Sequence, residues 1–107
     1  MLSMKYNDAA GRAAYLAGFH AAQALISEKT GRSVKTHGGV NTRFHQLVRD
    51  DARVDDELRT FLGRAYNLKA IADYETGPDS EVSSERASEA IATAKRFVAC
   101  VEALIDT

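Results

Sequence analysis

The residues that could carry out chemistry in this chain are histidines and arginines. Cleaving RNA without a metal needs a base that takes the proton of the 2′-hydroxyl and a cation that stabilises the charge on the phosphorus oxygens. Arg32 and His37 supply these two kinds of side chain, with four residues between them. The functional interpretation is a phosphate contact and a general base. The alternative is two exposed loop residues that match the pattern by chance.

A second set of candidates combines His20 with the end of the third predicted helix. His20 lies within the apolar stretch from Phe19 to Ala22, where histidines are most often buried and hydrogen-bonded. Lys69 and Asp73 are four residues apart, so the alternative to a catalytic role for them is a stabilising ion pair on one helical face. Tyr74 offers a hydroxyl at the end of the same helix. The candidate catalytic residues are therefore His37, His20, Lys69 and Asp73.

Positive charge is concentrated in the first half of the chain. Residues 1–49 contain seven Lys or Arg and two Asp or Glu, whereas residues 50–107 contain seven and thirteen. The segment from Lys29 to Arg49 has five positive residues and no acidic one, which suits an anionic partner such as a nucleotide or RNA. The alternative is a solvated face whose charges pair with acids of the second half. The candidate nucleotide or RNA contacts are Arg32, Lys35, Arg43 and Arg64.

The sequence contains no recognisable motif for binding a metal or a cofactor. There is no Gly-rich phosphate loop ending in Gly-Lys-Ser/Thr, no His-Glu-x-x-His, no Cys-x-x-Cys and no Gly-x-Ser-x-Gly. The three histidines lack the spacing of a ligand set, and the single cysteine, Cys100, cannot form an internal disulfide. We expect no metal or cofactor, and we expect Cys100 to be inert core packing.

Length and composition favour one compact domain over residues 1–107. The chain is 45% hydrophobic and 27% charged and has one proline, which excludes a disordered tail or a collagen-like repeat. Its longest uncharged stretch, residues 13–27, is shorter than the roughly 20 residues of a membrane span, and the N-terminus lacks the features of a signal peptide. We therefore expect a cytoplasmic protein with no membrane partner.

Hydrophobic periodicity predicts an all-α fold. Apolar residues recur every three or four positions in four stretches, and none shows the sustained alternation of a strand, so we expect an antiparallel four-helix bundle. The first predicted helix is capped by Asn7 or Asp8 and ended by Gly31, and a loop over 30–39 and a short helix over 40–48 follow it. The third predicted helix runs from Asp55 or Asp56 to Tyr74, and a turn over 76–79 follows it. The fourth predicted helix is capped by Ser83, and its apolar stripe includes Ile91, Val98 and Ile105.

Small residues dominate the first predicted helix. Gly18 lies among Ala14, Ala17, Ala21 and Ala22, which costs about 1 kcal/mol of helix propensity but creates a flat surface for close approach. We expect this surface to be a packing seam. Alanine-rich helices bury little area each, so a lone monomer would be marginal and a homodimer is expected.

Four groups of residues together resemble the small prokaryotic HEPN-domain proteins. Each string alone would be weak, but the four occur in order along nearly the whole chain. The resemblance implies a helical bundle that forms a dimer and is encoded beside a minimal nucleotidyltransferase partner. The strings are Tyr15 to Leu25, Thr36 to Val40, Leu68 with Ala72-Asp73-Tyr74, and Ala87 to Val98.

The resemblance also implies a function, from which this chain departs at one point. Active members of the wider superfamily are metal-independent ribonucleases, often toxins, that use an arginine followed a few residues later by a histidine. The third predicted helix has Arg64 and Lys69 but no histidine. We therefore expect a module of a toxin–antitoxin-like pair that binds a minimal nucleotidyltransferase, with Tyr74 as the position that such a partner modifies. The alternatives are a ribonuclease toxin with His20 or His37 as its base, and a nucleotide- or RNA-binding module without catalysis.

Overall fold

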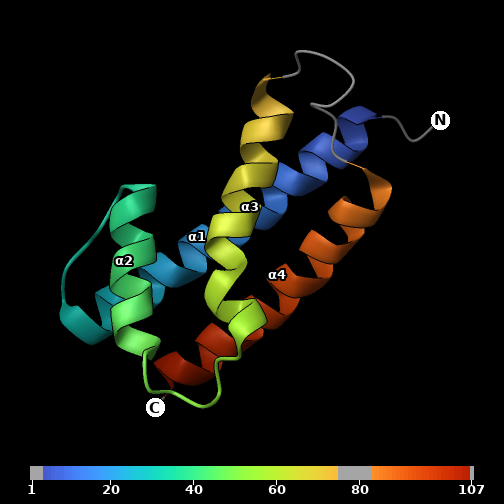
Figure 1. The fold of residues 1–107 in the computed structure, drawn as a ribbon. Helices are drawn as coiled ribbons and strands as arrows, with labels where there is room; N and C mark the ends of the chain where they lie inside the picture. The colour runs from blue at the N-terminus through green and yellow to red at the C-terminus, as the bar shows by residue number, and fades with distance from the viewer. Residues whose placement is uncertain (1–3, 75–82, 107) are drawn as a thin grey trace.

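Four α-helices form the fold. The computed structural model describes residues 4–74 and 83–106, with the backbone alone described for residues 4–6 and 72–74. No strand occurs in these ranges, which confirms the all-α prediction. The helices are α1 (Met4–Thr30), α2 (His37–Val48), α3 (Asp56–Tyr74) and α4 (Ser84–Ile105) (Figure 1).

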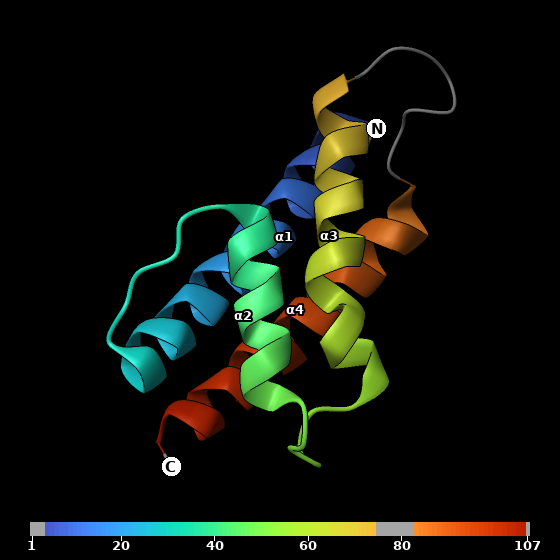
Figure 2. The same cartoon turned by 60° about the vertical axis from the view of Figure 1, so that its left-hand side comes forward.

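α1 is the central helix, and the other three pack against it. α3 runs antiparallel to α1 and to α4, whereas α1 and α4 start at the same end of the bundle (Figures 1 and 2). The extended segment 31–36 carries the chain back along α1, so α2 points in the same general direction as α1. The chain direction therefore does not alternate from each helix to the next as the sequence predicted.

Local capping sets three helix ends as predicted. The Asp55 carboxylate accepts a hydrogen bond from the amide of Leu58 at 2.9 Å, and the Ser83 hydroxyl accepts one from the amide of Arg86 at 3.1 Å. Both side chains satisfy amides that the first turn of a helix leaves unpaired. Gly31 follows α1 with a φ of +71°, a left-handed conformation that glycine adopts without a steric penalty.

α1 starts one turn earlier than predicted. The helix begins at Met4, so neither Asn7 nor Asp8 is its N-cap, and that prediction is wrong. The side-chain amide of Asn7 donates instead to the hydroxyl of Ser84 on α4 at 3.4 Å, and Asp8 is buried. Both residues therefore lie inside the helix, and Asn7 contacts α4. The predicted turn over 76–79 lies outside the described residues.

α2 also starts earlier than predicted. It begins at His37, so the connecting segment is 31–36 and not 30–39. Thr36 is the reason, because its hydroxyl accepts a hydrogen bond from the amide of Gly39 at 3.0 Å. This cap offsets the low helix propensity of Gly38 and Gly39. As a consequence, His37 is fixed at the first residue of a helix.

The core is one cluster of apolar side chains shared by all four helices. The ring centroid of Phe97 on α4 lies 5.1 Å from that of Phe44 on α2 and 5.0 Å from that of Phe61 on α3. The buried stripe of α4 is centred on Phe97, so three residues of the predicted stripe are only half-buried. These three are Ile91, Val98 and Ile105.

Gly18 forms the predicted packing seam between α1 and α3. The residue is buried, and a methyl group added to it would overlap the edge of the Phe61 ring. Phe61 itself is only 3% exposed, so its ring has little room to move away. Glycine is therefore required here by the close approach of the two helices.

Candidate functional site

Three rings from three helices meet at the start of α2. His37 Nδ1 lies 3.1 Å from the hydroxyl oxygen of Tyr15 on α1. The His37 ring stacks on Tyr66 of α3, with centroids 4.0 Å apart and an angle of 16° between the planes. Tyr15 meets Tyr66 edge to face at 5.6 Å. We call these three residues the His37 cluster.

The electrostatics of the His37 cluster favour uncharged side chains. Burial lowers the pKa of His37, and burial together with the neighbouring Tyr66 raises the pKa of Tyr15. A positive charge on His37 would also face the positive end of the α2 dipole. At neutral pH the cluster therefore holds a neutral imidazole and a neutral phenol, and the hydrogen bond occupies one of the two imidazole nitrogens.

We expect the free energy of unfolding to fall as the pH drops below about 6.5, the ordinary pKa of histidine. Because the folded pKa of His37 is lower, the unfolded chain binds this proton more readily, so stability is lost between pH 6.5 and that lower value. Urea titrations at several pH values should show this dependence as a slope of the free energy of unfolding against pH. His37→Gln should remove it, whereas the control His45→Gln should retain it. An unchanged slope in His37→Gln would contradict this assignment.

His20 lies apart from the His37 cluster. Its side chain is exposed on α1, and its Nδ1 is 3.1 Å from Oε1 of Gln23. Gln23 in turn donates to the carbonyl oxygen of Val34 at 2.9 Å. The prediction that His20 is buried is wrong, because the residue falls on the face of α1 that none of the other helices covers.

Among the side chains that the structure describes, no ion pair joins the basic segment from Lys29 to Arg49 to an acidic residue of the second half. Arg32 and Lys35 are exposed on the segment 31–36, and Arg43 donates to the side chain of Gln46 at 3.2 Å. The ion pairs between two described side chains, over residues 7–71 and 83–106, lie within the second half. They are Arg53 with Asp51, and Arg96 with Asp55 and Glu57. Binding of nucleotide or RNA by this segment stays a prediction.

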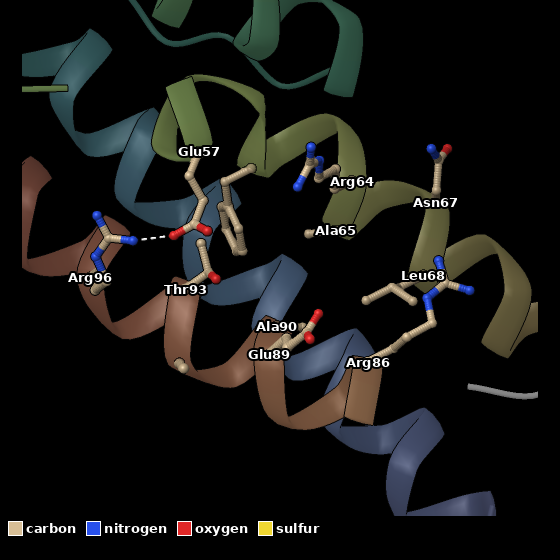
Figure 3. Close-up of a pocket in the computed structure, with 12 residues that line it drawn as sticks. Glu57, Arg64, Ala65, Asn67, Leu68, Arg86, Glu89, Ala90, Thr93 and Arg96 are labelled. Atoms are coloured by element: carbon tan, nitrogen blue, oxygen red, sulfur yellow. Dashed lines mark hydrogen bonds and ion pairs between the residues drawn. The ribbon is translucent and has the colours of Figure 1, made fainter. Parts of the chain in front are cut away.

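Arg64 lines a groove of about 700 Å³ between α3 and α4, together with Asn67 (Figure 3). The floor is apolar, and Arg86 and Glu89 of α4 lie on the opposite side. No histidine is among the described residues that line this groove. Arg64 and the His37 cluster are therefore not combined in one site.

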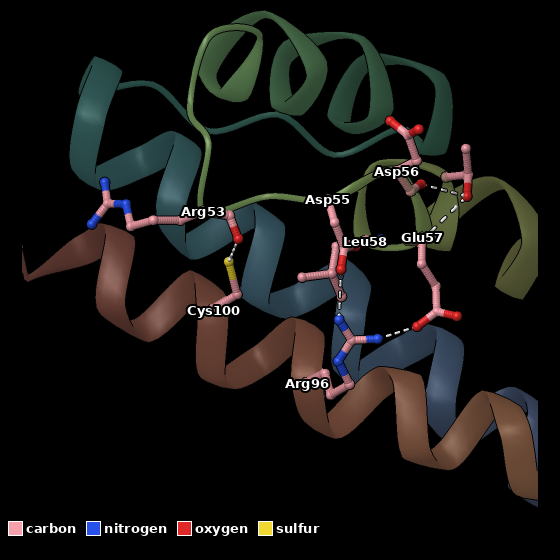
Figure 4. A network of polar contacts seen from close by, with 8 residues as sticks. Arg53, Asp55, Asp56, Glu57, Leu58, Arg96 and Cys100 are labelled. Atoms are coloured by element: carbon pink, nitrogen blue, oxygen red, sulfur yellow. Dashed lines mark hydrogen bonds and ion pairs between the residues drawn. The ribbon is translucent and has the colours of Figure 1, made fainter.

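A polar network joins the start of α3 to α4 (Figure 4). Arg96 donates to the carboxylate of Asp55 at 2.7 Å and to that of Glu57. The amide of Leu58, followed by Arg96, lowers the pKa of Asp55. The thiol of Cys100 donates to the carbonyl oxygen of Arg53 at 3.7 Å, and burial raises the pKa of this thiol. The network links the start of α3 to α4, and the raised pKa favours the thiol form of Cys100.

The family of the chain follows from comparison with known proteins. Residues 1–104 match the HEPN domain family. The chain belongs to this family. It is 34% identical over 93 residues to a protein of Methanocaldococcus jannaschii named "Putative toxin MJ0605". The aligned part is 87% of this chain and 66%, just under two thirds, of that relative. No solved structure gave a significant match.

The remaining predicted residues of this HEPN domain lie at the end of α3. Lys69 is half-buried on this helix. Asp73 and Tyr74 are its last two residues, and their side chains lie outside the described part of the structure. The roles of Lys69 and Asp73 in catalysis, and of Tyr74 as a modification site, therefore stay predictions.

Sequence reasoning missed two members of the HEPN domain's His37 cluster. Tyr15 was named only as the start of the string from Tyr15 to Leu25, which is largely apolar, and Tyr66 was not singled out. A tyrosine within an apolar stripe needs a partner for its hydroxyl when it is buried, and this was the available signal. Within the described ranges, no three metal-ligating side chains come together, and none of the helices is long and apolar enough to cross a membrane.

Proposed function

We propose that this HEPN chain is the toxin-like member of a toxin–antitoxin pair, that it acts as a homodimer, and that a minimal nucleotidyltransferase binds and modifies it. Two findings support the toxin-like role. The chain belongs to the HEPN family, and the relative with 34% identity carries the name of a toxin. The nucleotidyltransferase partner follows from the resemblance of four strings in the sequence to HEPN proteins of this kind.

The observation that carries the proposal is the placement of the three histidines. All three lie on α1 and α2, and the 19 residues of α3 contain none. The contacts of His37 are with two tyrosines, whereas Arg64 faces the α3–α4 groove. A base and a phosphate-binding arginine are thus not paired, which favours action through a partner over a self-contained ribonuclease site.

The residue that we propose as the modification site is Tyr74. In the reaction, the tyrosine oxygen attacks the α-phosphorus of a nucleoside triphosphate, and pyrophosphate leaves. The proton of the hydroxyl passes to a base of the transferase, so the HEPN chain needs to supply only the hydroxyl. The absence of a histidine on α3 is compatible with this acceptor role, because an acceptor requires no base of its own.

Co-purification tests the partnership directly. The tagged HEPN chain is co-expressed with the nucleotidyltransferase encoded beside it, and an unrelated nucleotidyltransferase serves as the control. We expect the neighbouring protein, and not the control, to remain bound through gel filtration at micromolar concentration. A HEPN chain that elutes alone in both cases would contradict the proposed partnership.

The ribonuclease alternative makes a different prediction. It requires cleavage of RNA by the purified chain in EDTA, and a loss of cleavage in His37→Ala or in His20→Ala that His45→Ala does not share. We expect RNA to stay intact in all four samples, because His37 contacts Tyr15 and Tyr66 and makes no contact with Arg64 in the described part of the structure. Cleavage that depends on His37 would favour the ribonuclease over the proposed acceptor role.

A further inference from the structure

The α3–α4 groove combines an apolar floor with charged walls (Figure 3). Both helices pack more extensively on α1 than on each other, so a space of about 700 Å³ is left between them. Between its charged residues, α4 lines this space with small side chains, which do not reach across to α3. These are Ala90, Ala92 and Thr93, and α3 contributes the apolar residues Phe61, Ala65 and Leu68.

The charges of the α3–α4 groove are not all paired. At one end, Arg96 of α4 donates to Glu57 of α3, and this ion pair joins the two walls (Figure 3). Beyond it, Arg64 lies on the α3 wall and Arg86 on the α4 wall, and both are exposed. Among the described residues, the guanidinium groups of these two arginines make no hydrogen bond or ion pair. Two cations on opposite walls are thus available to an acidic group of a ligand.

The composition of the α3–α4 groove fits a protein segment better than a nucleic acid. Single-stranded RNA is held by several cations that follow its phosphates. Here Glu89 lies on the same wall as Arg86, where its carboxylate would repel a phosphate. An apolar centre bordered by polar residues, with arginine enriched, is the usual anatomy of a protein interface. The segment that fits carries an apolar side chain for the floor and a carboxylate for the two arginines.

We infer that the α3–α4 groove binds an acidic segment of the nucleotidyltransferase partner, with an apolar side chain on the floor and a carboxylate between Arg64 and Arg86. The position of the groove supports this partner. The lining residues of α3 end at Leu68, and the backbone of Tyr74 follows about 9 Å further along the same helix. A stable protein interface covers about 800 Å² of each partner, so a transferase that reaches Tyr74 also covers surface at this distance.

This inference rests on the nucleotidyltransferase in the proposed function, and it names the surface and the side chains that hold this partner. It does not depend on the homodimer. It also assigns Arg64 to a carboxylate of a protein, in place of the nucleotide or RNA contact expected from the sequence.

Charge reversal tests the predicted contact with a carboxylate. The HEPN chain is titrated with the proposed nucleotidyltransferase partner, and the Kd is measured by calorimetry. Arg64→Glu and Arg86→Glu should each raise the Kd about tenfold or more, because the carboxylate of the partner then meets a second carboxylate. Glu89→Lys should lower the Kd, since it replaces the acid of the α4 wall by a cation. Lys95→Glu, exposed on α4 outside the groove, is the control and should leave the Kd unchanged.

A larger side chain tests the apolar part of the α3–α4 groove. Thr93 is half-buried and lines the groove from α4, so Thr93→Trp places a bulky ring where the apolar side chain of the partner would lie. We expect the Kd to rise about tenfold or more. Ala103→Trp, exposed on α4 outside the groove, is the control and should leave the Kd unchanged. Circular dichroism checks that each variant keeps its helical content.

The possible outcomes separate the α3–α4 groove from the partnership itself. A complex with the parent chain whose Kd is unchanged in Arg64→Glu, Arg86→Glu and Thr93→Trp would overturn the groove and leave the partnership. A parent chain that binds no transferase would overturn both. A labelled single-stranded RNA that binds the parent chain, and is lost in Arg64→Glu but not in Lys95→Glu, would assign the groove to nucleic acid and overturn the inference.

Discussion

Phe97→Ala is expected to lower the free energy of unfolding by about 3–5 kcal/mol, the usual loss for a buried phenylalanine. Phe97 is 1% exposed, and its ring packs against Phe44 and Phe61, so it joins α4 to α2 and α3 at one point. Truncation removes these contacts and leaves a cavity among three helices. Urea unfolding followed by circular dichroism measures the change.

The neighbouring residue is the matched control for this prediction. Val98 lies on the same helix but is only half-buried, so Val98→Ala should cost about 1 kcal/mol or less. Similar losses in Phe97→Ala and Val98→Ala would show that the core is not centred on Phe97.

Gly18→Ala and Gly63→Ala should change stability in opposite directions. At Gly18 the added methyl overlaps the Phe61 ring, whose Cδ2 would be 3.1 Å away, so we expect a loss of about 1–2 kcal/mol despite the gain in helix propensity. At Gly63, also inside a helix, the methyl meets open space and should stabilise the fold by about 0.5–1 kcal/mol. Urea midpoints of the two variants give the comparison. A stabilised Gly18→Ala variant would contradict the close approach of α1 and α3.

Local rules predicted those parts of the fold that depend on neighbouring residues. The caps at Asp55 and Ser83 and the glycine at the end of α1 need only a few adjacent residues, and all three are confirmed. The predicted start of α1 was wrong because the side chain of Asn7 does not cap the helix but contacts Ser84 of α4, which is 77 residues away in sequence. The seam at Gly18 was predictable because small side chains on one helical face indicate close approach, although the partner Phe61 was not.

The candidate site was harder to predict than the fold. Tyr15, His37 and Tyr66 come from three helices, and only the tertiary packing brings them together. His20 shows the converse error, since a histidine between apolar residues was expected inside the bundle but lies on the uncovered face of α1. Periodicity identifies helical faces, but it does not say which apolar face a neighbouring helix covers.

The intact mass of the HEPN chain tests the proposed function most directly. The chain is purified after expression alone and after expression with the proposed nucleotidyltransferase partner. Three forms are compared: the parent chain, Tyr74→Phe, and the control Tyr66→Phe on the same helix. We expect a gain of one or more nucleotidyl groups only with the partner present, in the parent and in Tyr66→Phe but not in Tyr74→Phe. An unchanged mass for the parent in the presence of the active partner, or an adduct that persists in Tyr74→Phe, would contradict Tyr74 as the modified residue of this pair.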